Sequence, residues 1–131
     1  MAAPEIVVQA GKVLNPWMLR IAGHVPPWVV LHHVGRRSGT EYATPLVAFA
    51  AQPQEQVVAV LPLPWGPGTD WARNTMSSGT VRLTRGGDEF EVRDVRLVPA
   101  AEAVGWLAPV PARALSTVGV KECLVGTLHR A

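Results

Sequence analysis

Alternation of apolar and polar residues is clearest between positions 80 and 98 of the chain. The apolar members Val81, Leu83, Phe90 and Val92 fall on one face of two extended segments, while arginines and glutamates fall on the other face. The sequence Gly-Gly-Asp at 86–88 separates the segments and suits a tight turn. This pattern predicts an antiparallel hairpin with one buried face and one solvated face.

Four further segments are short, apolar and rich in β-branched or aromatic residues, which is typical of strands. The six predicted strands are 28–34, 42–49, 57–61, 80–85, 89–98 and 120–128. The last of them places Cys123 in or near the core. We therefore expect a mainly β (α+β) domain, a small and mostly antiparallel Greek-key barrel with short flanking helices.

Helical spacing is confined to short stretches between the strands and at the start of the chain. The predicted helices are 4–14, 17–22, a helix that Asp70 N-caps and Ser78-Gly79 ends, 99–107 and a last turn at 112–117. Pro109 and Pro111 are expected to interrupt the final pair. Residues 1–23 form an N-terminal helical segment, which we interpret as a lid over one barrel end. A peripheral membrane contact through Trp17, Met18 and Ile21 is the alternative.

Composition limits the classes of protein that fit. A chain of 131 residues with 48% apolar and 17% charged residues suits a single domain, 1–131. The net charge is only +2, and neither a run of Lys and Arg nor tryptophans interleaved with basic residues indicates nucleic acid. One cysteine excludes an internal disulfide, and no zinc-ligand spacing is present. The sequence shows no leader peptide and no membrane span, so we expect a cytoplasmic protein.

Residues 35–39 (Gly-Arg-Arg-Ser-Gly) form the turn between the first two predicted strands. Glycines let the backbone approach a ligand, the guanidinium groups of Arg36 and Arg37 suit phosphate or carboxylate, and Ser38 adds a hydroxyl. The turn is therefore a candidate anion site. Taken alone, such a basic hairpin turn is more often a solvated turn than a binding site.

No grouping of residues indicates acid–base or nucleophilic catalysis. Acidic residues of the 80–98 hairpin lie on its solvated face, and Ser38 with His33 lacks an orienting acid nearby in the sequence. His32 and His33 lie on opposite faces of a strand, where hydrogen bonding to the hairpin backbone is the favoured role. The turn also lacks the Lys-Ser/Thr ending of a Walker loop. Hence the sequence assigns no catalytic residue and no metal ligand.

Four motifs in order resemble the deazaflavin-dependent nitroreductase family, split-barrel proteins that bind coenzyme F-420. They are Gly35-Arg36-Arg37-Ser38-Gly39, Thr44-Pro45-Leu46, the apolar strand 57–61 and Asp70-Trp71-Ala72-Arg73-Asn74, followed by the 80–98 hairpin. The resemblance covers roughly residues 14–98 and, loosely, the last strand. It implies a six-stranded antiparallel split barrel and hydride transfer from the reduced deazaflavin to a small electrophile such as a quinone, enone or nitro compound.

The resemblance also implies the cofactor contacts. Arg36, Arg37 and Ser38 would hold the phosphate-bearing tail, the strand 44–46 and the loop before Trp71 would flank the ring, and Trp71 with Asn74 would form the ring-side wall. The full predicted set is Arg36, Arg37, Ser38, Gly39, Thr44, Pro45, Leu46, Trp65, Gly66, Trp71 and Asn74.

Alternatives remain at this stage. A related split barrel could use flavin mononucleotide (FMN), or the barrel could bind a cofactor or a lipophilic molecule without turnover. Trp71 could be a core residue. Monomer and homodimer are both open, and the physiological substrate is not specified by the sequence.

Overall fold

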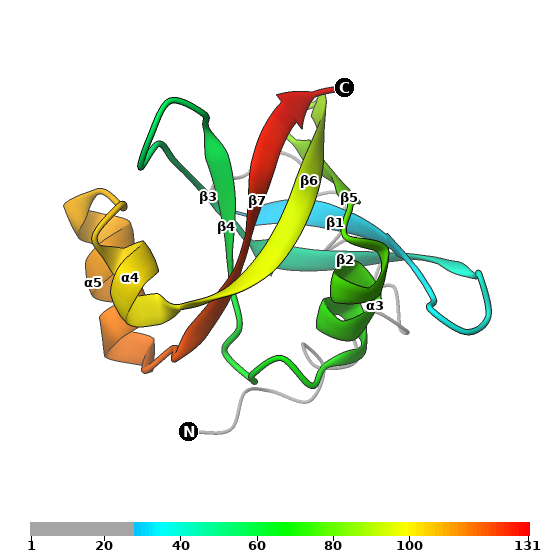
Figure 1. Cartoon of the computed structure of the whole chain (residues 1–131), viewed down its shortest axis with the longest axis horizontal. Coiled ribbons are helices and arrows are strands. Elements are labelled where there is room, and N and C mark those ends of the chain that lie inside the picture. Colours follow the sequence, from blue (N-terminus) through cyan, green and yellow to red (C-terminus); the bar gives the residue numbers. More distant parts are fainter. Residues whose placement is uncertain (1–27) are drawn as a thin grey trace.

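The computed structural model of the chain describes residues 28–131, so the predicted N-terminal helical segment 1–23 lies outside the described residues. The strands are β1 (Trp28–Val34), β2 (Glu41–Val47), β3 (Phe49–Ala51), β4 (Val58–Pro62), β5 (Val81–Arg85), β6 (Asp88–Pro99) and β7 (Glu122–Arg130). The helices are α3 (Asp70–Ser78), α4 (Ala100–Val104) and α5 (Pro109–Val118). These elements form a curled, mainly β domain (Figure 1).

All seven strands belong to one antiparallel sheet in the order β2-β1-β5-β6-β7-β4-β3. The two edge strands, β2 and β3, are consecutive in the chain, with only Ala48 between them. One continuous segment therefore pairs with β1 at one edge and with β4 at the other. The prediction of a barrel-like antiparallel sheet is confirmed, but the count of six strands is wrong because the predicted strand 42–49 serves both edges as two strands.

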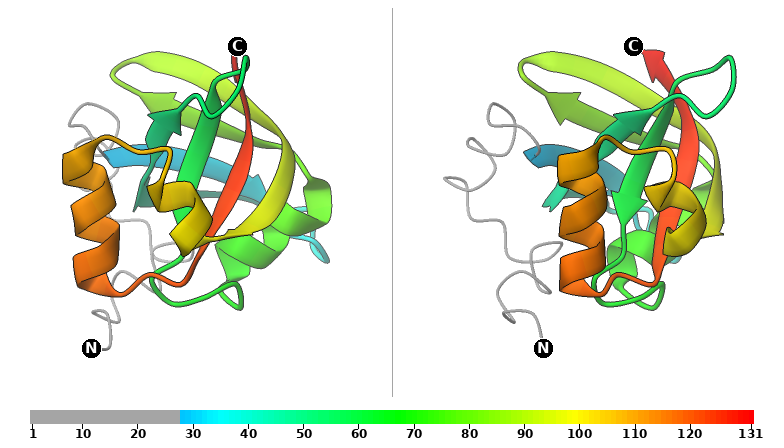
Figure 2. Two further views of the ribbon diagram at one scale, coloured as in Figure 1. Left: turned by 60° about the vertical axis from the view of Figure 1, so that its left-hand side comes forward. Right: turned by 90° about the vertical axis from the view of Figure 1, so that its left-hand side faces the viewer.

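The sheet buries apolar side chains on both of its faces. Inside the curl, a cluster includes Leu31, Leu61, Leu83 and Leu124, and α3 packs against it through Ala72. Strands with continuous apolar sequence also need a cover on the outer face. There, Val60, Val98, Cys123 and Val125 pack with Ala100 and Ala103 of α4 and Leu115 of α5 (Figure 2). Cys123 is thus in the core, as predicted.

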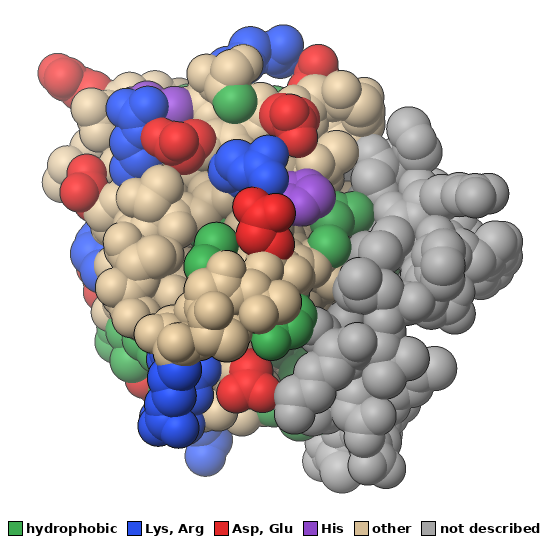
Figure 3. All heavy atoms as spheres, turned by 90° about the vertical axis from the view of Figure 1, so that its right-hand side faces the viewer, with side chains coloured by type: hydrophobic (Ala, Val, Ile, Leu, Met, Phe, Trp, Pro, Cys, Tyr) green, Lys and Arg blue, Asp and Glu red, His purple; other side chains and the backbone are tan. Residues whose placement is uncertain are grey.

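The predicted 80–98 hairpin is confirmed, with Leu83 opposite Phe90 and Val81 opposite Val92. The charged face carries ion pairs, including Arg82 Nη1 to Glu89 Oε1 at 3.6 Å and a contact between Arg93 and Glu91. On the face shown in Figure 3, acidic and basic side chains are intermixed. No helix among residues 28–131 is long and apolar enough to cross a membrane.

The starts of α3 and α5 differ from the prediction. Thr69, not Asp70, is the N-cap of α3, and Asp70 is its first residue. Pro109 and Pro111 do not interrupt the last helix, because α5 begins at Pro109 and both prolines lie in its first turn. A proline there loses no helical hydrogen bond, and its fixed φ suits the helix start. The predicted end of α3 is confirmed, since Gly79 is a left-handed C-cap with φ 74°.

Gly126 of β7 lies beside a β-bulge in strand β6. A Cβ at this position would lie 2.5 Å from Val92 Cγ1 and 2.7 Å from the carbonyl oxygen of Arg93. The register of β6 on β7 shifts between Arg93 and Arg96, so the crowding atoms belong to the sheet itself. Only glycine fits without moving the backbone of β6.

We therefore predict that Gly126→Ala lowers the free energy of unfolding by about 1–3 kcal/mol, the usual cost of overpacking a core. Urea unfolding measures the change. Gly105→Ala is the matched control, because its nearest contact would be an ordinary 3.4 Å to the carbonyl oxygen of Glu102. Equal stability of Gly126→Ala and the natural chain would contradict the prediction.

Candidate functional site

The turn between β1 and β2 is held by its own backbone. The Gly35 N–H donates to the Thr40 carbonyl at 2.8 Å, and the Gly39 N–H donates to the Gly35 carbonyl at 3.0 Å. Ser38 Oγ accepts the Thr40 N–H at 3.2 Å, which leaves the hydroxyl hydrogen of Ser38 available to a ligand. A Cβ on Gly35 would lie 2.5 Å from Ser38 Oγ, so this glycine is needed for the close turn.

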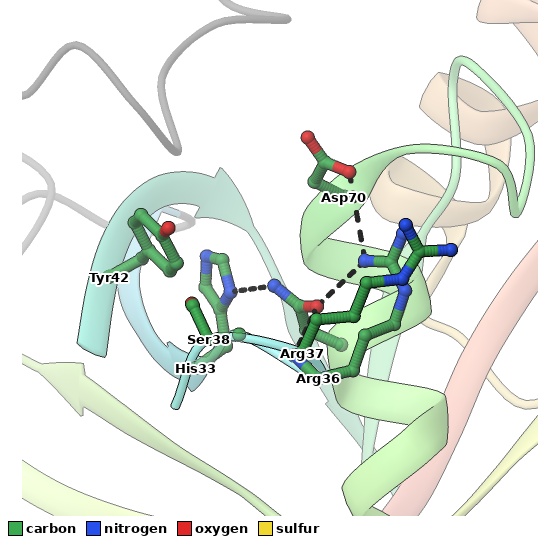
Figure 4. A pocket seen from close by; sticks show the side chains of 8 residues that line it. His33, Arg36, Arg37, Ser38, Tyr42 and Asp70 are labelled. Carbon is green, nitrogen blue, oxygen red and sulfur yellow. Dashed lines mark hydrogen bonds and ion pairs between the residues drawn. The ribbon is translucent and has the colours of Figure 1, made fainter. Parts of the chain in front are cut away.

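The turn is also tied to α3 through Asn74. Asn74 Oδ1 accepts two hydrogen bonds from Arg36, one from its backbone N–H at 3.1 Å and one from Nη1 at 2.8 Å. The same Nη1 lies 3.7 Å from Asp70 Oδ1. Figure 4 shows Arg36 pointing toward Asp70 at the start of α3. Arg36 is therefore partly committed to contacts within the protein, whereas Arg37 is exposed and makes no hydrogen bond or ion pair within residues 28–131.

His33 continues this network into the protein interior. Its Nδ1 lies 3.1 Å from Asn74 Nδ2, its Nε2 lies 2.8 Å from Thr44 Oγ1, and its ring stacks on Tyr42 at a centroid distance of 5.5 Å. Asn74 uses its oxygen for Arg36, so its amide group must donate to His33 Nδ1. The proton of the neutral ring is then on Nε2 and is donated to Thr44. The sequence predicted a structural role for His33, such as hydrogen bonding to the hairpin backbone; its hydrogen bonds instead join side chains of β2 and α3.

His33 is a neutral side chain in this environment. Burial lowers its pKa from 6.5 to about 4; neighbouring Asp70 acts in the raising direction and His32 in the lowering one. The ring is 4% exposed, so charging it would bury a cation. Protonation at Nδ1 would also place two donors, His33 and Asn74, against each other.

Two cavities border this network. The polar cavity, about 250 Å³, is lined by His33, Gly35, Arg36, Arg37, Ser38, Tyr42, Asp70 and Asn74. The apolar slot, about 130 Å³, is lined by Trp28, Thr44, Pro45, Leu46, Val47, Pro62, Pro64, Trp65, Thr69 and Trp71. Both use residues of β2 and of the beginning of α3.

The predicted site residues divide between these cavities. Arg36, Arg37, Ser38 and Asn74 line the polar cavity, whereas Thr44, Pro45, Leu46, Trp65 and Trp71 line the apolar slot. Asn74 and Trp71, expected on one wall, therefore line different cavities. Gly39 and Gly66 line neither; each has a positive φ, 72° and 78°, and shapes its loop.

Several lining residues were not among the predicted set. Tyr42 and His33 line the polar cavity, and Trp28 and Thr69 line the slot. The alternation of β1 could have indicated His33, because it shares a face with Val29 and Leu31, which are buried. Thr69 carries no comparable pattern. Within residues 28–131, no group of three or more His, Cys, Asp or Glu side chains is arranged to hold a metal ion.

Thr69 has a buried hydroxyl without a partner. It is the N-cap residue of α3, yet its side chain makes no capping hydrogen bond. Its Oγ1 is buried and has no hydrogen-bond partner among residues 28–131. Such an atom normally costs free energy unless something bonds it.

Comparisons with known proteins agree on the architecture. A chain described as a domain-swapped dimer aligns with a TM-score of 0.51 and 19% identity, over 77% of this chain and 80% of its own. An F420-H2 dependent reductase (FDR-A) aligns with a TM-score of 0.50 and 18% identity, over 77% of this chain and 94% of its own. Protein Atu2129 of Agrobacterium tumefaciens, of unknown function, aligns with a TM-score of 0.52 and 16% identity, over 98% of this chain and 59% of its own.

These likenesses show the fold of the protein, a small curled antiparallel barrel. The same fold is found in the F420-H2 dependent reductase. At such low identity the likeness establishes the fold. No protein-family model and no curated protein matches the sequence.

The lowered pKa of His33 gives a first prediction. The unfolded chain takes up this proton near pH 6.5, whereas the folded chain does so only near pH 4. The free energy of unfolding should therefore fall by up to about 1.4 kcal/mol per pH unit as the pH is lowered through this window. Urea unfolding at pH 7, 6 and 5 measures the slope. His33→Gln should reduce the slope of the free energy of unfolding against pH, while the smaller contribution of His32 stays in the variant and in the natural chain. Identical slopes for the two proteins would refute the lowered pKa of His33.

Thr69 gives a second prediction. Thr69→Val removes a hydroxyl that has no partner, so we expect the free energy of unfolding to rise by about 1 kcal/mol. Thr75→Val is the matched control on the same helix, because the Thr75 hydroxyl donates to the Trp71 carbonyl at 2.7 Å. That control should be less stable than the natural chain. A loss of stability in Thr69→Val similar to that of Thr75→Val would show that the Thr69 hydroxyl is satisfied.

Proposed function

We propose that the protein is an oxidoreductase that binds coenzyme F-420 and catalyses hydride transfer from its reduced form to a small electrophilic molecule. Quinones, enones and nitro compounds are the proposed substrate classes. The observation that carries the proposal is the pairing of a basic polar cavity and an apolar slot on the same two elements, β2 and the start of α3. The motif resemblance and the shared fold with an F420-H2 dependent reductase support the same assignment.

The polar cavity suits the phosphate-bearing tail of this coenzyme. Arg37 is exposed at the tip, Ser38 retains its hydroxyl hydrogen, and Arg36 has further guanidinium donors besides the Nη1 that contacts Asn74 and Asp70. Charge-assisted hydrogen bonds from such groups are the strongest that a phosphate receives from a protein. The proposed role of these residues is to anchor the tail.

The apolar slot suits one end of a planar ring. Pro45 is buried, Leu46 and Trp71 pack against the barrel core, and Trp65 lies across from them in the loop before α3. The slot is smaller than a complete tricyclic ring system, so the remainder of the ring would extend toward the polar cavity.

The reaction then depends on orientation and exclusion of water. Reduced coenzyme F-420, when bound, supplies the hydride. The slot residues would hold the ring in one orientation and keep water from it, which favours transfer to a substrate stacked on the open side. Acidic and basic side chains are absent from the described residues that line the slot, in keeping with a reaction in which the protein chiefly positions its ligands.

Titration of the purified full chain with coenzyme F-420 tests the proposal. We expect quenching of the deazaflavin fluorescence at micromolar concentrations, and oxidation of the reduced coenzyme when a quinone, enone or nitroaromatic compound is added. Arg37→Ala should raise the Kd about tenfold, since a charge-assisted contact is worth roughly 1.5–3 kcal/mol and part of it is screened at the surface.

Arg113→Ala is the matched control, because Arg113 is an exposed arginine of α5, outside both cavities. FMN is titrated in parallel. Binding of FMN but not of coenzyme F-420 would replace the proposal with a flavin enzyme. Tight binding of the deazaflavin without turnover would indicate a carrier. Absence of binding by either compound would refute the assignment.

A further inference from the structure

His33 is a buried imidazole that the proposed reaction does not use. It lies at the end of β1 and borders the polar cavity, and its hydrogen-bond partner Thr44 borders the apolar slot. Figure 4 shows its ring beside that of Tyr42. A buried polar ring in this position needs its hydrogen bonds satisfied, and both ring nitrogens have a partner.

The direction of each hydrogen bond follows from Arg36. Both of its bonds to Asn74 are donated to Oδ1, so Asn74 can only donate toward His33. His33 in turn must accept at Nδ1 and donate from Nε2 to Thr44. If residue 33 donated a hydrogen bond from the position of Nδ1, the Asn74 amide would favour the flipped orientation, with its oxygen toward residue 33. In that orientation the amide nitrogen of Asn74 would face the two donors of Arg36.

The orientation of the Asn74 amide affects the candidate anion site in the turn between β1 and β2. Asn74 holds both the backbone and the guanidinium group of Arg36, and these are the contacts that fix the first residue of the turn against α3. Asp70 is the competing partner of this guanidinium group, at 3.7 Å, and it is 57% exposed. If the Asn74 amide lost this orientation, the Arg36 guanidinium group would contact Asp70 or solvent instead.

We propose that His33 is a positioning residue for anion binding: through Asn74 it holds Arg36 in the geometry that receives the anionic tail of the ligand. The identity of the tail rests on the proposed function, but the positioning of Arg36 is a property of the ligand-free protein. The role proposed for His33 does not require contact with the tail or with the reacting atoms. It orients the amide that orients the guanidinium group.

The test compares a ligand with the tail and one without it. Coenzyme F-420 and the same deazaflavin ring lacking the phosphate-bearing tail are titrated into the natural chain, His33→Phe and His33→Gln. Phenylalanine keeps an aromatic ring beside Tyr42 but has no nitrogen, whereas glutamine keeps an acceptor and a donor. We expect His33→Phe to weaken binding of the tailed ligand about tenfold and to change the tail-less ligand less than twofold, and His33→Gln to restore most of the loss.

A double-mutant cycle tests whether His33 acts through Asn74. If it does, His33→Phe combined with Asn74→Ala binds the tailed ligand no more weakly than Asn74→Ala alone. Independent, additive losses would overturn the proposal. Equal weakening of both ligands in His33→Phe would also overturn it, because that result is expected of a residue that only supports the fold.

A measurement on the ligand-free protein separates this proposal from the proposed function. Nitrogen-15 NMR should show His33 protonated at Nε2, and the Arg36 amide signal should shift in His33→Phe but not in His33→Gln. Inorganic phosphate should move the signals of the turn more strongly in the natural chain than in His33→Phe. If these results hold while neither deazaflavin binds, the positioning role stands and the oxidoreductase assignment fails; a proton on Nδ1 of His33 would overturn the positioning role.

Discussion

The segment 41–51 constrains the whole structure because it supplies both edges of the sheet. β2 pairs with β1, β3 pairs with β4, and a single residue, Ala48, separates the two pairings. The sheet must curl until its edges meet this one segment. An unpaired edge of a sheet exposes backbone donors and acceptors, and continuity of the edge strands limits that exposure. The same constraint brings β2 beside the loop before α3, so the apolar slot is a direct result of how the barrel closes.

Hydrogen bonds of Asn74 are the second constraint, and they position the turn between β1 and β2, which projects from this barrel. Hydrogen bonds within the turn fix its shape, but they do not fix where it lies relative to α3. The three contacts of Asn74, two with Arg36 and one with His33, supply that placement. Since Asn74 is 4% exposed, these bonds form away from competing water. The polar cavity exists because the turn and the helix are held together at this point.

Sequence reasoning succeeded where the determining contacts are local. The 80–98 hairpin follows from period-two alternation around Gly86 and Gly87, and the end of α3 follows from Gly79. Sequence reasoning failed where a residue or strand distant in the chain determines the local structure. The role of His33 depends on Asn74, which is 41 positions away, and the division of one predicted strand into β2 and β3 depends on two different neighbouring strands. The motif residues lie on β2, on α3 and in the two loops beside them, and no local pattern separates those of the polar cavity from those of the slot.

The two adjacent arginines show why residue type alone does not define such a site. Arg36 and Arg37 are equivalent in the motif, yet only Arg36 contacts Asn74 and Asp70, with 21% of its side chain exposed. One guanidinium group is therefore pre-organised by the protein, and the other is free to move toward a ligand. Asp70 offsets part of the positive charge near Arg36, so net charge is a weak basis for selecting one anion over another. If the turn binds an anion as proposed, selection would instead depend on the fixed directions of the Arg36 donors, and the geometry set by Asn74 would then be the chief source of specificity.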